Sequence, residues 1–449
     1  MEEKEIWYDF TAAQNVTLLQ CKFTLYKRVI NILSSTTSDT PLDFKILKKA
    51  LDLTIERNDC LRIEFKKRNG KWQQRFLPSR PLDHVEELTF STKEEQDAFI
   101  DRETKHAIKW KKNISFTPYF IHTYDNKDMV FLKVSHLVLD LYGLNNIYND
   151  LFACYDALKN GTPLPVEPGS YEEVVKRDLK QQQDPSYLQS NREFFETFLK
   201  EHEMPYYTGI HGPDEPIWQK QVAKGRHSMK MFFIHCDTTS TVYPLAKATV
   251  EKAIKYSTEH KYSLANVLFY IMSITASHLN GNVKYASPIE LCNCRATKQE
   301  KTSGGTKAQS LSAYTVMDYE KSFQDNMEAF SKSQAILYRH IGFPDVEFEA
   351  MRNKIYKKPM LEILYSICFS LVPFKKTPGR TFQAYSNHKG ALPCYIDLMY
   401  DVDSSEIEIV FDYQTKTHTE ENIRDFVAMY DKNINALLDT PNMLLKELP

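Results

Sequence analysis

Residues 114–135 predict two β-strands joined by a polar turn, and a helix follows almost at once. From Leu144 the apolar side chains recur at helical spacing, and the pattern ends at Gly161. His136 therefore lies at a junction between a strand and a helix. This alternation argues against an all-helical or all-strand chain and favours packed layers of the α/β class.

Strand and helix patterns occur on both sides of a candidate linker. Residues 163–185 combine several prolines with a glycine and a charged stretch, which is a composition typical of linkers. We therefore predict two domains, residues 1–175 and residues 176–449, and no short internal repeat. The other predicted elements are helices at 42–57, 191–202, 264–279 and 423–437, strands at 60–65, 283–291, 395–399 and 407–413, and a polar loop at 296–307.

Composition excludes several classes of function. The 449 residues include 57 Lys and Arg against 59 Asp and Glu, so the formal net charge is −2 and we expect no nucleic-acid partner. The longest apolar stretch, residues 264–279, is interrupted by polar side chains and is too short for a membrane span. The first residues are acidic and lack an apolar segment, which predicts no signal peptide and a cytoplasmic protein.

The eight cysteines are scattered along the chain. Only Cys292 and Cys294 are near neighbours, and no pair has the spacing of a metal site. We therefore expect reduced cysteines and no bound metal. Alternate residues of a strand face the same side, so these two are predicted to share one face of a strand.

His136 and Asp140 supply the first candidate chemistry. A neutral imidazole, with a pKa of about 6.5, can take a proton from an amine or a hydroxyl that attacks a carbonyl. Asp140 is predicted to be buried and to need a compensating cation, because an unpaired buried carboxylate is strongly destabilising. Taken alone, this spacing is equally compatible with a hydrogen-bonded core histidine.

Several segments follow the motif order of one enzyme family. They are Phe10–Gln14 (FTAAQ, against SxAQ), Arg57–Phe65 (RNDCLRIEF, against RHExLRTxF), Ser135–Leu141 (SHLVLDL, against HHxxxDG), Gly304–Leu311 (GGTKAQSL, against IGxFVNT), His340–Pro344 (HIGFP, against HQDxPF) and Pro441–Pro449, at the family's C-terminal boundary. Through these motifs the chain resembles the condensation domains of nonribosomal peptide synthetases over essentially its whole length.

The resemblance implies a fold and a reaction. The fold is α/β, with two chloramphenicol acetyltransferase-like lobes that form a V-shaped pseudo-dimer around a tunnel. A donor acyl or peptidyl thioester and an acceptor amine are joined into an amide. Both substrates arrive on the phosphopantetheine of carrier proteins, or from an adjoining adenylation and carrier module, and the domain itself binds no cofactor. A monomer without nucleic-acid or membrane partners is expected.

The resemblance also assigns roles to single residues. His136 is the catalytic histidine, as a general base or as the group that orients the amine. Arg295 resembles the arginine that follows a family strand, and it is the candidate partner of Asp140. Ser135 and Arg62 complete the structural support of the site, and Arg62 is expected to stabilise the first lobe rather than to touch substrate. The expected substrate-channel residues are Leu141, Tyr142, Gly143, Gln309 and Ser310.

The chain departs from the family pattern at several positions. Ser135 replaces the first motif histidine, which is usually structural, and Leu141 replaces the motif glycine. Leucine disfavours some torsions that glycine adopts, so Leu141 is expected either to narrow the acceptor channel or to mark an inactive domain, with Gly143 as a partial compensation. Lys307 stands where an aromatic residue is usual, and Gln309 where asparagine is usual.

Three functions follow from these observations. The first is an amide-forming condensation domain, either free-standing or the leading or excised domain of a larger synthetase. The second is a related O-acyltransferase that forms an ester from a carrier-protein or acyl-CoA donor. The third is a catalytically silent module that recruits a carrier or a tailoring protein. Epimerisation and heterocyclisation are disfavoured, because the full double-histidine motif and the aspartate-rich motif are both absent.

Overall fold

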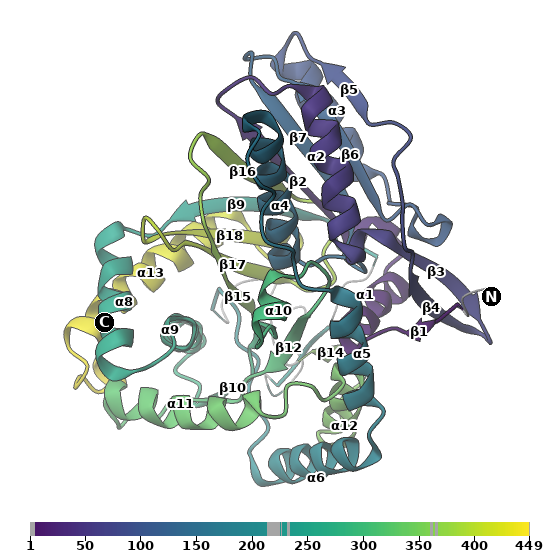
Figure 1. The fold of residues 1–449 in the computed structure, drawn as a ribbon. Coiled ribbons are helices and arrows are strands. Elements are labelled where there is room, and N and C mark those ends of the chain that lie inside the picture. The colour runs from purple at the N-terminus through teal and green to yellow at the C-terminus, as the bar shows by residue number, and fades with distance from the viewer. Residues whose placement is uncertain are drawn as a thin grey trace. The chain divides into compact units, whose positions relative to one another are not determined.

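The structure, a computed structural model, describes residues 5–212, 225, 227–230, 234–359, 362–363 and 367–448. It divides into two compact units (Figure 1). The first contains residues 1–184, 293–308 and 375–389, and the second contains 185–292, 309–374 and 390–449. The first unit thus takes in two segments from far along the chain, whereas the sequence predicts a single division at 175/176.

The first unit begins with strands and helices that alternate along the chain. Its elements are β1 (Tyr8–Asp9), α1 (Ala12–Phe23), η1 (Lys27–Ile30), β2 (Asn31–Ser38), α2 (Phe44–Arg57), η2 (Asp59–Arg62), β3 (Ile63–Arg68), β4 (Lys71–Phe76), β5 (Glu86–Thr89), α3 (Lys93–Lys105), η3 (Trp110–Lys112), β6 (Phe116–His122), β7 (Asp128–Ser135), α4 (Leu141–Asn160), α5 (Tyr171–Gln182), α10 (Lys298–Thr302) and β16 (Arg380–Tyr385).

A five-stranded sheet, in the order β16-β2-β7-β6-β5, is the centre of the first unit. Its strands are antiparallel except for the parallel pair β5 and β6. Helices α2 and α4 pack along each other on one face (Figure 1), where Tyr148 of α4 donates a hydrogen bond to the carbonyl of Ser34. On the other face, Phe99 of α3 packs against Phe131 of β7. A second sheet, β1-β4-β3, is antiparallel throughout.

The second unit also mixes strands and helices. Its elements are α6 (Pro185–Glu201), β8 (Met229–Lys230), β9 (Thr238–Pro244), α8 (Lys247–His260), α9 (Leu264–Leu279), β10 (Tyr285–Ala286), β11 (Ile289–Asn293), β12 (Ala308–Ser312), β13 (Thr315–Val316), α11 (Phe323–Tyr338), α12 (Asp345–Ile355), β14 (Glu362–Ile363), β15 (Ile367–Phe374), β17 (Cys394–Asp401), β18 (Glu406–Gln414), α13 (Glu420–Asp439) and η4 (Leu445–Glu447). The last residue of β11 and the first of β12 belong to the first unit.

A six-stranded sheet, in the order β12-β11-β15-β17-β18-β9, supports the second unit. The pairs β11–β15 and β15–β17 are parallel, whereas β17–β18 and β18–β9 are antiparallel. Helix α9 is buried on nearly all sides, as its apolar composition predicts, and its Phe269 packs against Phe369 of β15. The predicted α/β class is therefore confirmed in both units.

The predicted helices and strands agree with the structure over most of the chain. The helix expected at 264–279 has these same limits, and Asp43 caps α2 by accepting hydrogen bonds from two backbone N–H groups. The strand expected at 60–65 begins only at Ile63, because η2 occupies residues 59–62. Cys294 follows the end of β11 at Asn293, so the prediction that it shares a strand face with Cys292 is wrong.

Two predictions of irregular chain are wrong in part. The second half of the candidate linker at 163–185 forms α5, in which Ser170 caps the helix and Val174 and Leu179 are buried. The polar loop predicted at 296–307 contains the short helix α10, which is held by a capping box between Thr297 and Glu300. In both cases a cap residue precedes a glutamate at helical spacing, and this local signal outweighs the polar composition.

In the part of the chain that the structure describes, no helix is both long enough and apolar enough to cross a membrane. The predictions that concern Met1–Lys4 and Pro449 lie outside the described residues. Among the described residues, no three or more His, Cys, Asp or Glu side chains are grouped in a way that could hold a metal ion.

Candidate functional site

The turn between β7 and α4 holds the predicted catalytic histidine. Ser135 ends β7, and its hydroxyl accepts a hydrogen bond from the backbone N–H of Leu137 at 3.3 Å. The N–H of His136 donates to the carbonyl of Ile30 at 2.8 Å. Leu137, Val138 and Leu139 are completely buried. The chain therefore leaves the sheet in a fixed turn, and Ser135 supports that turn through its side chain.

His136 is half-buried, and its Nδ1 atom is enclosed without a hydrogen bond to any other residue that the structure describes. Burial lowers the pKa of the imidazole below its usual value, because the charged form loses hydration. The charge of Asp140 and the main chain of His136 act in the opposite direction but do not outweigh burial. The ring is therefore neutral at physiological pH and retains a nitrogen that can accept a proton.

Asp140 is the N-cap of α4, and its buried carboxylate accepts five N–H groups. The guanidinium of Arg295 donates to both oxygens at 2.8 and 2.9 Å. The backbone N–H groups of Gly143, Lys307 and Ala308 donate at 2.7, 2.8 and 3.0 Å. Although burial acts to raise the pKa of this carboxyl, Arg295 and the backbone donors lower it below its usual value. Asp140 is therefore a permanent anion whose oxygens are already occupied.

Arg295 joins several parts of the first unit. Besides Asp140, its guanidinium donates to the carbonyl of Gly305 at 2.9 Å and to the side-chain oxygen of Asn293 at 3.0 Å. The guanidinium carbon also lies 4.9 Å from the centre of the Tyr142 ring, which places a cation over an aromatic face. The two residues predicted to pair, Asp140 and Arg295, are thus in direct contact, and Tyr142 contributes by covering the arginine.

Glycines allow the start of α4 to approach the segment 304–308. A Cβ atom at Gly143 would lie 2.5 Å from the carbonyl oxygen of Gly305, which is closer than real Cβ contacts. Gly305 itself has a φ of +88°, and a side chain there would overlap the ring of Tyr171. In the same segment, the hydroxyl of Thr306 donates to the carbonyl of His136 at 2.6 Å. Glycine is therefore needed at 143, two residues after the motif glycine position.

Leu141 does not occupy a strained position. It is the first residue of α4, and it is not among the residues with positive φ. The expectation that leucine opposes the backbone torsions here is therefore wrong, because a helical first turn suits leucine. Its side chain is half-buried, and its effect on a substrate channel stays a prediction.

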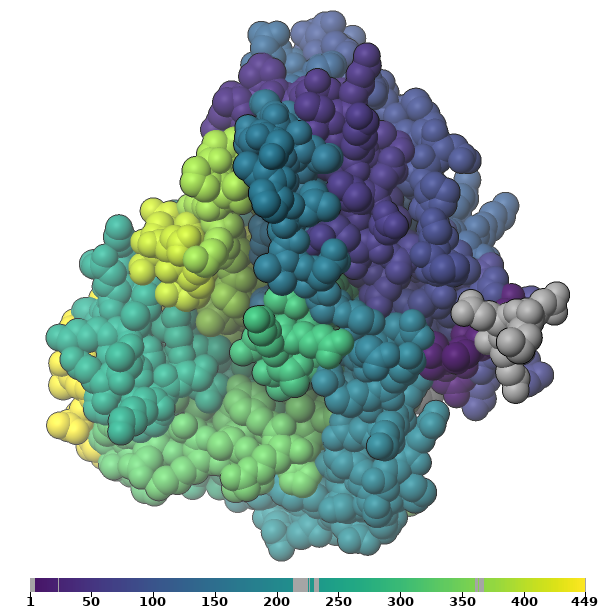
Figure 2. Space-filling model, in the orientation of Figure 1, coloured from purple at the N-terminus to yellow at the C-terminus, as the bar shows by residue number. Residues whose placement is uncertain are grey.

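Helix α5 holds the segment 304–308 through its side chains. The hydroxyl of Tyr171 donates to the carbonyl of Thr306 at 2.8 Å. The ammonium of Lys307 is buried and contacts both carboxylate oxygens of Asp178, at 2.7 and 2.9 Å, with Glu300 at 3.3 Å. Lys307 stands where the family usually has an aromatic residue, and its charge is compensated by Asp178 of α5. Figure 2 shows α10, which carries Glu300, at the surface beside α4 and α5.

The composition of residues 163–185 predicts a linker and therefore assigns no role to Tyr171 and Asp178. The available signal was the series Ser170, Glu173, Val174 and Leu179, which combines a cap with apolar residues at helical spacing. Both residues form hydrogen bonds with the segment 304–308, which lies more than 120 positions further along the sequence. A local sequence pattern cannot predict contacts over such a separation.

The opening motif also reaches the site segment. Gln14 is completely buried, and its amide donates to the carbonyl of Leu137 at 2.9 Å and to Gln74 of β4 at 2.8 Å. Arg62 has a different role. It donates to the backbone carbonyls of Ile55, Glu56 and Leu77, and so it ties α2 to the chain after β4. The role of Arg62 as support of the first lobe stays a prediction.

Gln309 and Ser310, expected in the substrate channel, belong to the second unit. Gln309 is buried, and its side-chain oxygen has no hydrogen-bond partner among the described residues. Ser310 donates to the carboxylate of Asp345 at 2.5 Å. Burial raises the pKa of Asp345 to about 7, with the nearby Glu349 adding to the shift and Ser310 opposing it. The channel role of both residues stays a prediction.

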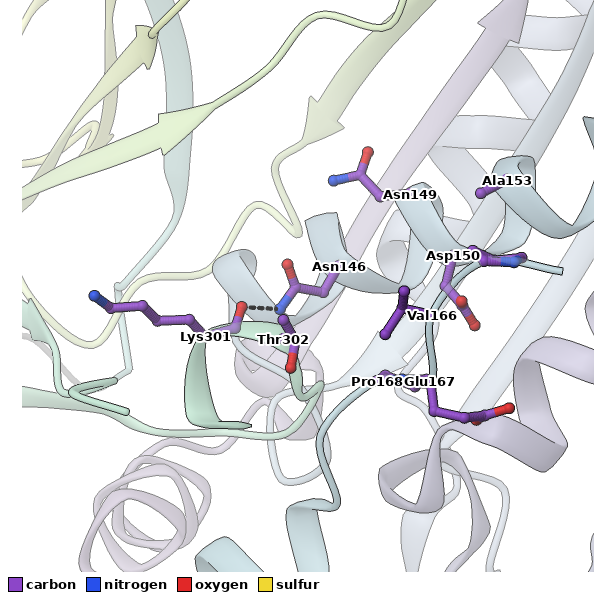
Figure 3. A pocket seen from close by; sticks show the side chains of 10 residues that line it. Asn146, Asn149, Asp150, Ala153, Val166, Glu167, Pro168, Lys301 and Thr302 are labelled. Atoms are coloured by element: carbon purple, nitrogen blue, oxygen red, sulfur yellow. Dashed lines mark hydrogen bonds between the residues drawn. The ribbon is translucent and has the colours of Figure 1, made fainter. Parts of the chain in front are cut away.

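A groove of about 320 Å³ also lies in the first unit (Figure 3). Its polar groups are largely used within the protein: Asn146 donates to the carbonyls of Lys301 and Ser303, and Asp150 accepts hydrogen bonds from Arg57. Neither His136 nor Asp140 lines this groove, so it is distinct from the candidate site. Its lining residues are Asn146, Asn149, Asp150, Ala153, Pro165, Val166, Glu167, Pro168, Lys301 and Thr302.

Comparison of the sequence with known families and proteins gives a consistent result. Residues 4–449 match the family model described as "Condensation domain". The chain is 22% identical over 422 residues to a plipastatin synthase protein of Bacillus subtilis (strain 168), and the match covers 91% of this chain and 15% of the relative. It is also 26% identical over 155 residues to tyrocidine synthase 3 of Brevibacillus parabrevis, covering 33% of this chain and 2% of the relative. The chain thus spans only a small part of these relatives.

Solved structures show the same fold. The starter condensation domain of rhizomide synthetase RzmA aligns with a TM-score of 0.78 at 16% identity, covering 98% of this chain and 96% of that chain. The condensation domain of the monacolin K polyketide synthase MokA aligns with a TM-score of 0.79 at 12% identity, covering 98% of this chain and 99% of that chain. The backbone arrangement is thus retained although few residues are shared.

Proposed function

Because this chain belongs to the condensation domain family, we propose that it joins a carrier-bound acyl or peptidyl thioester to an acceptor amine as an amide. The observation that carries the proposal is the state of His136. Its ring is neutral, it forms no hydrogen bond with another described residue, and it sits on a turn fixed by strand, helix and the segment 304–308. A base or orienting group for an amine needs these properties.

The proposed reaction balances without a further reactant. The amine nitrogen of the acceptor attacks the carbonyl carbon of the thioester, and the carbon–sulfur bond breaks. The proton lost by the amine is taken by the free nitrogen of His136 and passes to the thiolate that leaves. The products are an amide on the acceptor and a free phosphopantetheine thiol on the donor carrier. His136 is regenerated in its neutral form.

Asp140 supports this reaction without exchanging protons. Its oxygens are occupied by Arg295 and three backbone N–H groups, and its lowered pKa keeps it ionised. It joins α4 to the segment that also binds the carbonyl of His136 through Thr306. We therefore infer that Asp140 and Arg295 position the turn that carries the histidine.

Two observations favour an active enzyme over a silent recruiting module. The main argument for a silent module is Leu141, and Leu141 lies in the first turn of α4 without a positive φ. The close approach of α4 to the segment 304–308 is met by Gly143 instead. An ester-forming activity would use the same histidine with a hydroxyl acceptor, so the acceptor nucleophile distinguishes the two reactions.

The test measures acyl transfer by intact mass. Acyl and aminoacyl thioesters of carrier proteins are offered with free amines, free alcohols and aminoacyl carriers, to the wild-type protein and to a His136→Ala variant. The matched control is His84→Ala, which removes an exposed imidazole from the same unit. We expect an amide product that forms with the wild type and with His84→Ala and is lost in His136→Ala.

The outcomes separate the three functions. An ester as the sole product would replace the amide assignment by O-acyl transfer. No product from any pair, in a protein that still binds carrier protein, would support the recruiting module. Retained amide formation in a folded His136→Ala variant would overturn the role of His136, and a denaturation curve for each variant establishes that it is folded.

A further inference from the structure

The main chain of His136 is held from two sides within the first unit. Its N–H donates to the carbonyl of Ile30, the last residue of η1, at 2.8 Å. Its carbonyl accepts a hydrogen bond from the hydroxyl of Thr306 at 2.6 Å. Because this carbonyl and the imidazole side chain are attached to the same Cα atom, a displacement of the carbonyl also moves the ring. The second contact comes from a side chain, so it depends on which residue stands at position 306.

The main chain around Thr306 is anchored independently of its hydroxyl. The carbonyl of Gly305 accepts from the N–H of Asp140 at 3.2 Å, and the N–H of Lys307 donates to the carboxylate of Asp140 at 2.8 Å. The carbonyl of Thr306 accepts from the hydroxyl of Tyr171 at 2.8 Å. A substitution that removes only the hydroxyl of Thr306 therefore leaves these anchors of the backbone in place.

The carbonyl that Thr306 binds distinguishes it from an ordinary buried threonine. Thr54 is such an ordinary case in the same unit: it is completely buried, and its hydroxyl donates at 2.9 Å to the carbonyl of Ala50, four residues earlier in α2. The hydroxyl of Thr306 instead binds a residue 170 positions away, and that residue carries the imidazole. The two hydroxyls thus make similar hydrogen bonds, but only one of them acts on His136.

We propose that Thr306 is a positioning residue for acyl transfer, and that its hydroxyl sets the orientation of the His136 ring through the carbonyl of His136. This inference rests on the proposed function. Thr306 falls at the position that the motif IGxFVNT leaves unspecified, so the family pattern assigns it no role. Tyr171 acts one step further away, because its hydroxyl binds the carbonyl of Thr306. A misplacement of about 1 Å at a reacting group can lower the rate about a hundredfold, so the effect belongs to kcat.

The test compares two substitutions at position 306 with one control. Thr306→Val removes the hydroxyl and retains the branched shape of the side chain. A methyl group does not approach a carbonyl oxygen as closely as a hydroxyl does, so the carbonyl of His136 loses its partner and is displaced. Thr306→Ser retains the hydroxyl. The control is Thr54→Val, which removes a buried hydroxyl whose hydrogen bond stays within α2.

The kinetic constants for acyl transfer separate positioning from substrate binding. Thr306→Val should lower kcat about 10- to 100-fold and leave KM for both substrates unchanged, because only the orientation of the ring is altered. Thr306→Ser should retain most of kcat, and Thr54→Val should keep the wild-type values. If folded Thr306→Val has wild-type kcat, or if Thr54→Val loses as much, the hydroxyl of Thr306 is structural only and the proposal is wrong.

Tyr171→Phe is a second variant for the case in which Thr306→Val does not fold. It removes only the hydroxyl that binds the carbonyl of Thr306, and it keeps the aromatic ring beside Gly305. We expect a smaller loss of kcat, again with KM unchanged. When Thr306→Val is unfolded, this loss upholds the proposal, and wild-type kcat in Tyr171→Phe contradicts it.

A second readout is independent of turnover. The titration of the His136 ring is followed by NMR in protein with isotope-labelled histidine, and His136→Ala assigns the resonance. Burial holds the pKa of this ring below its usual value, whereas the main chain of His136 acts to raise it. In Thr306→Val the displaced ring gains hydration, and the released carbonyl can accept from its protonated form, so the pKa should rise. The acid limb of kcat/KM should move to higher pH with it, and Thr306→Ser should titrate as the wild type does.

The two readouts distinguish a failure of this proposal from a failure of the proposed function. If the wild type transfers no acyl group, the proposed function fails, and the ring titration alone decides whether Thr306 orients His136. A raised pKa in Thr306→Val that is absent in Thr306→Ser would then uphold the positioning role. The same titration curve in the wild type and in folded Thr306→Val would overturn it.

Discussion

At the scale of single residues, the site places two titratable groups in opposite environments. Burial removes hydration from both His136 and Asp140, yet only Asp140 receives compensating donors. The result is a neutral imidazole beside a permanent carboxylate. A substitution at His136 tests the proton-transfer role, and a substitution at Asp140 tests the positioning role. The two roles can therefore be examined separately.

The buried pair of Asp140 and Arg295 leads to a stability prediction. Asp140→Asn leaves the guanidinium of Arg295 buried without a counter-charge, and we expect a loss of about 3–5 kcal/mol in the free energy of unfolding. Arg295→Met leaves the carboxylate unpaired and has a similar cost. The double variant Asp140→Asn/Arg295→Met should be more stable than either single variant. Chemical denaturation measures all three, and strictly additive losses would contradict a direct pair.

The lowered pKa of His136 predicts the pH dependence of the reaction. Burial lowers this pKa, so the neutral ring dominates above the ordinary value of about 6.5 and is lost only at lower pH. The ratio kcat/KM should therefore be flat near neutral pH and decline below about pH 6.5. It is measured with a thioester that is chemically stable across this range. A limb whose midpoint lies above 6.5 would show that another group controls proton transfer.

At the scale of elements, the sequence predicts the parts of the site that local pattern controls. The strand at 128–135 and the helix after Asp140 both follow from periodicity. The family resemblance supplied Arg295 as the partner of Asp140, a pairing that no local pattern contains. The roles of Tyr171 and Asp178 were missed, because their contacts join α5 to a distant segment. At α5 the charged composition predicts a linker, but the N-cap residue and the apolar residues at helical spacing form a helix.

The two glycines at the ends of α4 give a matched test of close packing. Gly143→Ala places a methyl group against the carbonyl of Gly305 at the start of the helix. We expect a loss of about 1–3 kcal/mol in stability and a strong loss of acyl transfer, because the turn at His136 must shift. Gly161→Ala is the control at the other end. That position has a φ of +65° but no neighbouring atoms, so about 1–2 kcal/mol of strain should leave activity intact.

The result that would contradict this interpretation is an active Gly143→Ala enzyme with normal kcat/KM. It would mean that α4 and the segment 304–308 separate without disturbing His136. Equal losses of activity in the two glycine variants would indicate a general effect of helix stability. Denaturation curves and kinetics on the same preparations distinguish these outcomes.

At the scale of the whole molecule, the first unit is assembled from three stretches of chain. Residues 1–184 supply most of its sheet, but β16 completes one edge by pairing with β2 over Tyr385 to Arg380. The segment 293–308 supplies Arg295 and Lys307, the cations that face Asp140 and Asp178. The sequence predicted two α/β bodies but a single division between them. Local sequence patterns cannot predict that β16 pairs with β2, because the two strands are far apart in the chain.

This assembly predicts that residues 1–184 do not form a stable unit when expressed alone. The fragment retains Asp140 and Asp178 but lacks both cations, and it leaves the β2 edge unpaired. Uncompensated buried carboxylates and an unpaired strand edge should prevent cooperative unfolding and promote association. Circular dichroism, denaturant titration and sedimentation measure these properties, with the full chain as reference. A monomeric fragment with one cooperative transition would show that the first unit folds before the later segments join it.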